Sequence, residues 1–281
     1  MAIREVLFQN EYKLPERFEP DDRIVDIGAH IGTFAIACLE RRAKWLACYE
    51  PVKENFEYLD RNLRRGWRRW STTNGADSID DPPRIRIHNR AVWRNDEPSG
   101  FRDIVLAGPA NTAMAWMLLE EDQTTPHEPG ITDRPLEQVV TIPFDKVIFD
   151  ATEGWKHRIR LVKIDAEGSE WLMLEGSQTL GHIDQLVMEV HLRAHHLCGK
   201  FAGSLENLEA KLAQAGFYVR VLPHPLCDDL KQVRCKRIQR PKKYTMAHEP
   251  EQEEVAIKKD GLIVTVQHGE PTDGSTSPVS I

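Results

Sequence analysis

The stretch RIVDIGAHIG, residues 23–32, carries the first strong strand signal of the sequence. A short β-branched run ends in two glycines, at positions 28 and 32, which is typical of a buried strand that turns directly into a helix. The apolar residues of 32–42 recur at helical spacing, those of 44–50 form a second short run, and those of 51–65 return to helical spacing. Strand, helix, strand and helix in close succession predict parallel strands joined by right-handed crossovers.

The rest of the sequence continues this alternation. Further strands are expected near residues 84, 160, 185, 217 and 232, which together with the first two give seven. A helix is expected over residues 204–217, and another after Ser169, which is expected to cap it. Four segments are less regular: residues 101–108 and 139–148 resemble strands, whereas 66–83 and most of 107–135 resemble loops. The order of elements predicts an α/β fold.

Composition limits the classes to which the protein can belong. The 281 residues carry a formal net charge of −7, which disfavours a uniformly basic nucleic-acid-binding protein. No stretch approaches the roughly 18 consecutive apolar residues of a membrane-spanning helix, and the N-terminus lacks the apolar core of a signal peptide. The cysteines argue against a disulfide framework or a zinc knuckle, because they include no Cys-x-x-Cys pair and stand at 38, 48, 198, 227 and 235. We therefore expect a protein of the reducing cytoplasm.

Acidic residues around the glycine-rich turn indicate a ligand. Asp26, Gly28 and Gly32 give the spacing D-x-G-x-x-x-G, which differs from the G-x-G-x-x-G of dinucleotide-binding folds. An acid beside such a turn suits a cationic ligand better than a pyrophosphate, and Glu50 at the end of the second strand can accept both hydroxyls of a ribose. Alternatively, the turn is an ordinary strand-to-helix connection and Glu50 only favours a helix N-terminus. Together these residues indicate an adenosine-type ligand without a diphosphate, which S-adenosylmethionine fits.

Three motifs resemble the successive signatures of the FkbM family of S-adenosylmethionine-dependent methyltransferases. They are VDIGAHIGTFAIA at 25–37, EPVKENFEYLDRNL at 50–63 and VKIDAEGSEWLMLEG at 162–176, and the similarity covers roughly residues 24–220. The resemblance implies the class I methyltransferase fold, a Rossmann-like α/β architecture. Its seven-stranded, mostly parallel sheet carries helices on both faces, and its last strand is antiparallel. The strands expected from the sequence give the same count.

The resemblance also implies which residues hold the cofactor. The glycine-rich turn would hold the methionine part, Glu50 the ribose, and residues 89–91 would border the adenine. His30 departs from the family pattern, in which an asparagine is usual at this position. The residues expected at S-adenosylmethionine are Asp26, Gly28, His30, Gly32, Glu50, Asn89 and Ala91.

A general base is expected among the residues that end the fourth and fifth strands. Methyl transfer to a hydroxyl requires an aligned acceptor oxygen and a group that removes its proton. Asp165 and Glu167 follow the fourth strand, and we expect one of them to contact the acceptor or the methionine amine. His191 ends the fifth strand and is expected to accept the proton, because an imidazole with a pKa of about 6.5 suits base work at neutral pH. The alternative is that both acids cap the following helix and pair with Lys163.

A metal site is the less favoured interpretation of this region. Imidazole and carboxylate are ordinary metal ligands, and alternate residues of a strand share a face. No second carboxylate lies nearby in sequence, so we expect hydrogen-bonding histidines and no metal. The residues concerned are Glu189, His191, His195 and His196.

The resemblance implies O-methylation of a hydroxyl on a sugar, a glycan or another small-molecule natural product. Five arginines and two tryptophans within residues 61–70 leave an RNA ribose methyltransferase as an alternative, because arginine pairs with phosphates and tryptophan stacks on bases. The same cluster is equally consistent with a solvated helix end whose tryptophans pack on the sheet. A non-catalytic module that binds S-adenosylmethionine is the third alternative, although intact glycines and acids argue against it. The oligomeric state is left open.

The domain organisation follows from a shift in composition. We expect a methyltransferase domain over residues 1–240, with its core at 24–220, and a C-terminal extension over 241–281. The extension contains an acidic run, a segment at 255–266 that suits a hairpin about its Asp-Gly pair, and a polar, flexible tail.

Overall fold

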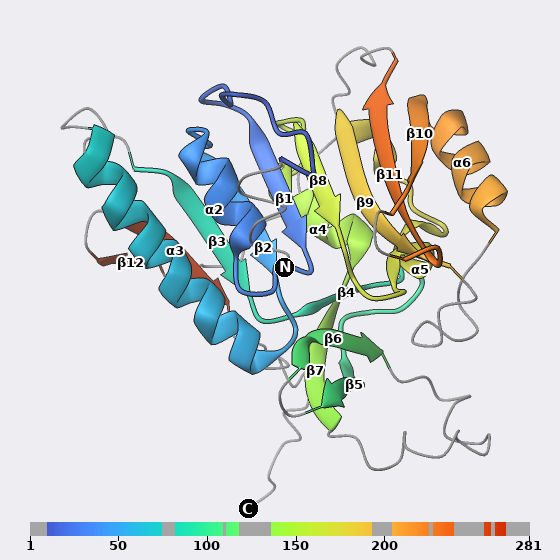
Figure 1. Ribbon diagram of the computed structural model, residues 1–281, viewed down its shortest axis with the longest axis horizontal. Coiled ribbons are helices and arrows are strands. Elements are labelled where there is room, and N and C mark those ends of the chain that lie inside the picture. The colour runs from blue at the N-terminus through green and yellow to red at the C-terminus, as the bar shows by residue number, and fades with distance from the viewer. Residues whose placement is uncertain are drawn as a thin grey trace, which may run out of the picture.

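The main sheet organises the molecule. The computed structural model describes residues 10–74, 82–108, 111–117, 136–192, 204–224, 227–238, 256–259 and 262–267. Within these residues the main sheet has nine strands (Figure 1). Their order is β10 (Phe217–Pro223), β11 (Leu230–Arg237), β9 (Gln185–His191), β8 (Leu161–Ile164), β1 (Arg23–Ile27), β2 (Trp45–Tyr49), β3 (Arg84–His88), β13 (Leu262–Gln267) and β12 (Ala256–Lys259).

Seven of these strands form the sheet that the sequence predicted. β1 pairs parallel with β2 and β8, β2 with β3, and β8 with β9, whereas β11 is antiparallel to both β9 and β10. The class I methyltransferase fold, with its mostly parallel sheet and antiparallel last strand, is therefore confirmed. Its strand order changes direction at β1, and ligands of such sheets bind at the carboxyl ends of the strands beside that point.

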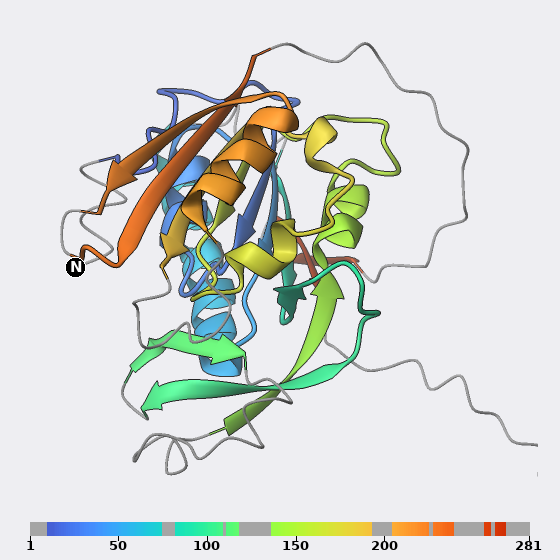
Figure 2. The ribbon, with the colours of Figure 1, turned by 90° about the vertical axis from the view of Figure 1, so that its right-hand side faces the viewer.

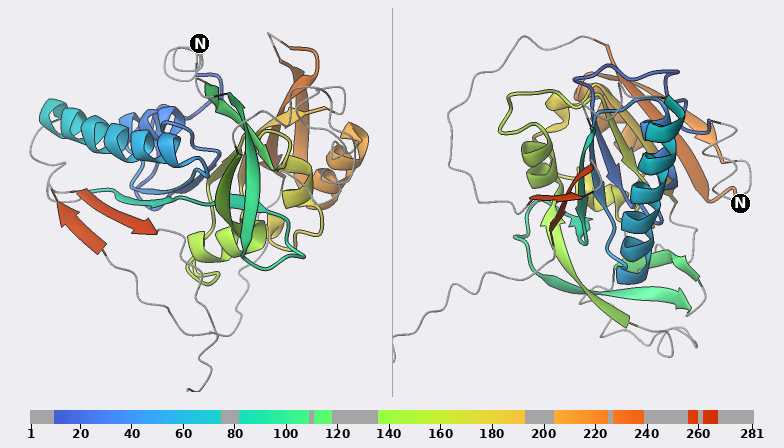
Figure 3. Two further views of the ribbon diagram at one scale, coloured as in Figure 1. Left: turned by 90° about the horizontal axis from the view of Figure 1, so that it is seen from below. Right: turned by 90° about the vertical axis from the view of Figure 1, so that its left-hand side faces the viewer.

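The two additional strands come from the C-terminal segment. β12 pairs antiparallel with β13, and β13 pairs parallel with β3 at the edge of the sheet (Figure 3). Both lie in or next to the segment at 255–266 for which a hairpin was expected. Residues 260–261 and the tail from 268 onward lie outside the described residues, and the division of the chain at residue 240 stays a prediction.

Helices cover both faces of the main sheet (Figure 2). Ile24 belongs to the apolar core under one group of helices and Val25 to the core under the other, because successive strand residues point to opposite faces. None of the helices in the described part of the chain combines the length and apolar character needed to cross a membrane. One face carries α2 (Thr33–Glu40) and α3 (Lys53–Asn74), and the other α4 (Phe144–Ala151), α5 (Glu170–Leu174), the short 3₁₀ helix η3 (Leu180–His182) and α6 (Leu205–Gln214).

Helix α3 corrects the loop that was expected over residues 66–83. The helix continues to Asn74, and residues 75–81 lie outside the described part. Gly66 suggested an end to the helix, but Trp67 continues the apolar spacing and is only 4% exposed in the core under α2 and α3. Burial of a tryptophan stabilises the helix by more than the roughly 1 kcal/mol that an interior glycine costs.

A second, smaller sheet lies below the carboxyl ends of the main parallel strands in Figure 1. This sheet packs on α5 as well as on itself, because Leu172 of α5 belongs to its buried core, with Val52, Ala91, Trp93, Ile104 and Val139. Among the described residues its strand order is β4 (Ala91–Trp93), β7 (Leu136–Pro143), β5 (Phe101–Gly108) and β6 (Asn111–Met117).

One expectation for this sheet is wrong, and another is tested only in part. Residues 111–117, within the segment expected to be mostly irregular, form β6, because pairing with β5 supplies a backbone ladder that the local pattern does not reveal; residues 118–135 lie outside the described residues. The strand expected over residues 139–148 ends at Pro143, which is the N-cap of α4. Asp145 in the first turn favours the helix start, and the buried Val147 and Ile148 face the core of the main sheet.

Gly28 allows three strands to converge at the carboxyl edge of the main sheet. Its φ of +72° lies in the left-handed region, and its N–H donates to the carbonyl of Tyr49 at 3.0 Å. A Cβ at this position would lie 1.8 Å from the backbone carbonyl oxygen of Asp165, while the N–H of Asp165 donates to the carbonyl of Ile27. The ends of β1, β2 and β8 can therefore approach this closely only around a residue without a side chain.

The Gly28→Ala variant is expected to lose about 3 kcal/mol or more of unfolding free energy, because backbone atoms cannot move aside for the added methyl group. Gly176→Ala is the matched control: Gly176 also has a φ of +72°, but no atom lies within 4 Å of the place that a Cβ would take there. The control should lose only the conformational strain, about 1 kcal/mol. Urea denaturation of both variants tests this, and equal losses would contradict the proposed clash.

Candidate active site

A buried lysine links the first strand to the acids that follow the fourth. The ammonium of Lys163 donates to the carbonyl of Gly28 at 2.7 Å and lies 3.4 Å from Asp26 Oδ1 and 3.5 Å from Asp165 Oδ2. Burial alone would lower the pKa of Lys163, but Asp26 and Asp165 outweigh burial and raise it above its ordinary value. The lysine therefore stays charged and holds the glycine-rich turn against β8.

Asp26 and Asp165 differ in accessibility. The Asp26 side chain has no exposed surface, and burial raises its pKa against the opposing effect of Lys163. The expectation that Asp26 contacts the methionine part stays a prediction; in this structure the carboxylate of Asp26 lies against Lys163. Asp165, with 27% of its side chain exposed, is the acid of this pair that a ligand can reach.

Glu50 fixes the turn from the neighbouring strand. Its carboxylate accepts from the N–H of His30 at 2.8 Å, from the N–H of Val52 at 3.0 Å and from the amide of Asn55 at 3.3 Å. Burial raises the pKa of Glu50 to about 7, although these three hydrogen bonds oppose the rise. A carboxylate oriented by three donors at the end of β2 is suited to hold a ribose.

The conformation of His30 accounts for its place in the motif. His30 has a φ of +49°, a left-handed conformation in which asparagine, aspartate and histidine are the most tolerated residues other than glycine. Histidine can therefore replace the usual asparagine, and its hydrogen bond to Glu50 uses the backbone N–H. Burial, with a smaller contribution from Lys163, lowers the pKa of the His30 imidazole, which favours its neutral form.

Other residues expected at the cofactor lie at the same edge. Gly32 is the N-cap of α2 with a φ of +91°, and a Cβ there would lie 2.8 Å from a methyl group of Leu59 on α3. The Asn89 side chain donates to the carbonyls of Glu50 at 3.0 Å and of Pro51 at 2.8 Å, so it holds the segment that carries Glu50. Ala91 is 5% exposed, similar to Glu50 at 4%, and its contact with the adenine stays a prediction.

His191 lies between two carboxylates. Its Nε2 is 3.2 Å from Glu167 Oε2, and its Nδ1 is 3.2 Å from Glu170 Oε1. Burial alone would lower the pKa of His191, but Glu170 and Glu167 raise it to about 12. The imidazole is therefore held as a cation with both N–H groups engaged. That His191 accepts the proton stays a prediction, and this geometry favours a structural cation instead; the two acids that surround His191 are not apparent from its strand-end position.

Glu170 belongs to the third sequence motif but was not expected at the site, and it has a second role in the same network. Its carboxylate accepts from the N–H of Ala166 at 2.9 Å and from the N–H of Gly168 at 3.0 Å. It thus satisfies backbone donors before α5, whereas Ser169 occupies the N-cap without a side-chain hydrogen bond. Neither Asp165 nor Glu167 makes these contacts, so the alternative that they cap the helix is incorrect, although Asp165 does pair with Lys163.

A second histidine–carboxylate pair lies next to this network. His224 Nε2 is 3.7 Å from Glu189 Oε2. The side-chain atoms with which Glu11, Glu189 and His224 could bind a metal all lie within 4.8 Å of one another. Glu11 and His224 were missed, since each stands alone in an irregular segment far from Glu189 in sequence. We interpret both histidine–carboxylate groups as ion-pair networks. His195 and His196 lie outside the described residues, and the absence of a metal stays a prediction.

Comparisons with known proteins agree with this geometry. The family model described as "Methyltransferase FkbM domain" matches residues 26–219, more than half of the chain. The chain belongs to the FkbM methyltransferase family. The family resemblance seen in its three sequence motifs is confirmed, and residues 26–219 form a methyltransferase domain of this family. No curated protein matches the chain in a sequence search.

Solved structures of several methyltransferases resemble the FkbM chain. Methyltransferase FkbM from Methylobacillus flagellatus KT is 17% identical, with a TM-score of 0.46, over 82% of this chain and 47% of that one. The present chain thus spans about half the length of that protein. A putative RNA methyltransferase from Pyrococcus horikoshii is 13% identical (TM-score 0.38; 85% and 84% covered). Magnesium protoporphyrin IX methyltransferase from Synechocystis PCC 6803, with bound SAM, is 8% identical (TM-score 0.42; 84% and 78% covered).

The charge on His191 makes the stability of this enzyme depend on pH. Because the folded-state pKa of His191 is above its unfolded value of about 6.5, its contribution to stability is complete below that pH and is lost as the pH rises toward 12. His191→Gln also leaves the fully buried Glu170 without its cation. We expect a loss of about 3–5 kcal/mol at pH 6 and a smaller loss at pH 9.5.

Urea denaturation at the two pH values measures this difference. His157→Gln serves as the control, because His157 is 43% exposed where it meets Glu153, and its replacement should cost less than about 1 kcal/mol. A loss for His191→Gln that is the same at both pH values would show that His191 is neutral in the folded protein.

Proposed function

We propose that this FkbM protein transfers a methyl group from S-adenosylmethionine to a hydroxyl group of a sugar, a glycan or another small-molecule natural product. The observation that carries the proposal is the arrangement at the carboxyl edge of β1, β2 and β8. There Glu50 is oriented by three donors beside the glycine-rich turn, and Asp165, which follows β8, is partly exposed. Glu50 suits the ribose, and Asp165 suits the methionine amine.

The charges at this edge fit a cationic cofactor. Carboxylates outnumber the two buried cations, Lys163 and His191, and both cations are already paired with acids. A pyrophosphate would be repelled by such a site, whereas an ammonium and a sulfonium group would be attracted. The acids at this edge are Glu11, Asp26, Glu50, Asp165, Glu167, Glu170 and Glu189.

The chain supplies positioning and proton transfer. S-adenosylmethionine, when bound, supplies an electrophilic methyl group. The Gly28 turn and Glu50 would hold the nucleoside, and Asp165 the methionine amine. Glu167 and Glu189 keep 19% and 22% of their side chains exposed beside Asp165, so that a carboxylate can meet an acceptor hydroxyl and take its proton.

The arginine-rich part of α3 favours a small acceptor over RNA. Arg64 pairs with Asp60 at 2.8 Å, the Arg61 guanidinium lies 5.2 Å from the centre of the Tyr58 ring, and Trp67 is buried. These contacts belong to a solvated helix with a buried face. The side chains of residues 68–70 lie outside the described part. Together with the net charge of −7, these contacts give little support to a phosphate-binding surface.

We also propose that the enzyme functions in the cytoplasm. Among the described cysteines, Cys38, Cys48, Cys227 and Cys235 are free thiols, as expected in a reducing compartment.

Glu50→Gln is expected to weaken the binding of S-adenosylhomocysteine by about 10–100-fold. The substitution removes the charge that strengthens hydrogen bonds to the ribose, which are worth about 1.5–3 kcal/mol to a charged partner. Isothermal titration calorimetry measures the affinity, and Glu57→Gln on the exposed surface of α3 is the control. An affinity equal to that of the wild type would remove Glu50 from the cofactor site.

The acceptor class can be tested with labelled methyl groups and the Asp165→Asn variant. Wild-type enzyme is expected to label hydroxyls in a panel of methyl glycosides and hydroxylated natural products. Asp165→Asn should lower kcat/KM by about 100-fold, since a charged contact to the cofactor is lost, while the urea midpoint changes little. Label found in RNA and in none of the small molecules would contradict the proposed acceptor, and wild-type turnover in Asp165→Asn would contradict the role of Asp165.

A further inference from the structure

The hydroxyl that receives the methyl group needs a carboxylate to take its proton. That carboxylate should not already be paired with Lys163 or His191. Asp165 is paired with Lys163, Glu167 and Glu170 with His191, and Glu50 with two backbone N–H groups and an amide. Each of these carboxylates is therefore engaged in holding the glycine-rich turn, the lysine or the histidine in place. Glu189 differs, because the ion-pair partner that the structure gives it is the imidazole of His224.

The strand register places Glu189 beside Asp165. Ile164 of β8 pairs with Met188 of β9, so the next residues of the two parallel strands, Asp165 and Glu189, follow side by side at the carboxyl edge. After burial, Asp165 is the strongest influence on the ionisation of Glu189. With Asp165 assigned to the methionine amine under the proposed function, Glu189 lies one strand farther from β1, where an acceptor hydroxyl can approach.

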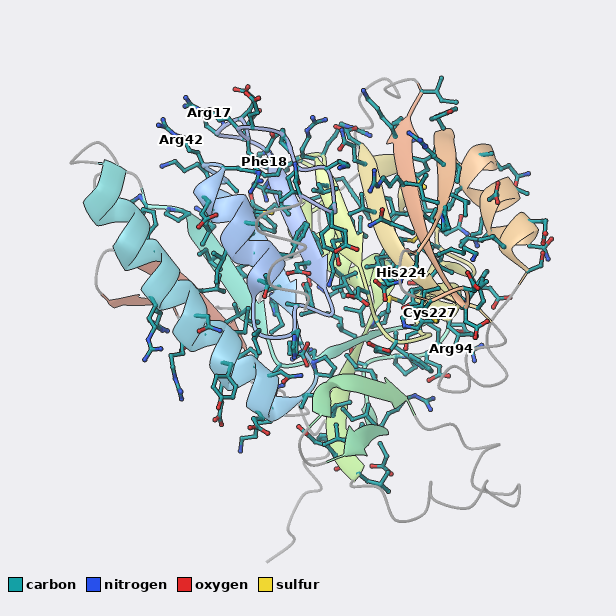
Figure 4. All side chains as sticks on the ribbon, in the orientation of Figure 1. Arg17, Phe18, Arg42, Arg94, His224 and Cys227 are labelled. Atoms are coloured by element: carbon teal, nitrogen blue, oxygen red, sulfur yellow. The ribbon has the colours of Figure 1, made fainter. Side chains whose placement is uncertain are left out.

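Glu189 is also reachable from solvent. Its side chain is 22% exposed and that of His224 is 12% exposed, so the pair is covered but open at one side. Three segments distant in sequence meet here: β9 carries Glu189, the segment after β10 carries His224 (labelled in Figure 4), and the N-terminal segment carries Glu11. A general base has to combine this shielding with access to its substrate.

We propose that Glu189 is the general base of this methyltransferase and that His224 is its positioning residue. The inference rests on the proposed function and adds the group that takes the proton. As the acceptor oxygen forms the new C–O bond, the electron pair of the breaking C–S bond stays on sulfur. The hydroxyl proton passes to a carboxylate oxygen of Glu189 and leaves to solvent before the next turnover.

The groups around Glu189 determine its response to pH. Asp165 and Lys163 face it from β8, Glu167 from the following loop, His191 from its own strand, Glu11 and Tyr12 from the N-terminal segment, and His224 from the segment after β10. Burial, followed by Asp165, raises the pKa of Glu189 to about 8, while His191 opposes the rise. The ionised, basic form therefore increases as the pH rises through this value, and turnover should increase with it.

Kinetics of Glu189→Gln provide the first test. With labelled S-adenosylmethionine and the methyl glycoside panel, kcat should fall by about 10²–10⁴-fold, while the affinity for S-adenosylhomocysteine stays within twofold of wild type. A plot of the wild-type rate against pH should bend near pH 8, whereas the plot for the residual rate of Glu189→Gln should not. His224→Gln should move the bend and retain more activity than Glu189→Gln. A Glu189→Gln rate within threefold of wild type, or a bend that persists, overturns the assignment.

A second measurement separates this proposal from the proposed function. Carbon-13 NMR of the glutamate carboxyls, with Glu189 assigned through Glu189→Gln, should show a signal that titrates near pH 8 and shifts when S-adenosylhomocysteine binds. A signal that does not shift when S-adenosylhomocysteine is added overturns the placement of Glu189, even if the enzyme is active. A shifting signal without label transfer to the panel would support the placement while contradicting the acceptor class. Activity lost with EDTA and restored by Mn²⁺ would also overturn the assignment.

Discussion

The ion pair between Lys163 and Asp26 holds the carboxyl edge of the main sheet together. Asp26 is on β1, Lys163 is on β8, and both side chains are almost completely buried. Burying one of these charges without the other would cost several kcal/mol, so neither residue can be changed alone. Because the same ammonium also binds the carbonyl of Gly28, the ion pair fixes the conformation of the turn that carries the site.

The arrangement of the site follows from that constraint. Gly28 has to be a glycine, since its missing side chain leaves room for the backbone of Asp165. With β8 this close, Asp165 emerges directly beside the turn and Glu50 reaches the other side through the N–H of His30. A fold-stabilising contact between two strands thus also determines the distance between the acids that a nucleoside cofactor would meet.

Much of the fold could be predicted from the sequence, and part of the site. The seven strands of the class I sheet and the edge that holds Asp26, Glu50 and Asp165 follow from periodicity and from the family motifs, because alternating buried strands leave a strong local signal. The length of α3 and strand β6 could not be predicted, since burial of Trp67 and pairing with β5 are tertiary effects. The protonation of His191 could not be predicted for the same reason, because it depends on Glu170, which lies on α5 and not on the strand of His191.

The division of roles among the acids is best explained by the distribution of two cations. Lys163 pairs with Asp26 and Asp165, and His191 pairs with Glu167 and Glu170. These carboxylates can attract a cationic ligand, but their oxygens are already engaged with the two cations that hold the site together. Glu189 pairs with the imidazole of His224 rather than with Lys163, and the neighbouring acids repel its negative charge. Its protonated form is therefore populated near neutral pH. One cluster of acids therefore separates into groups that bind charge and a group that exchanges a proton.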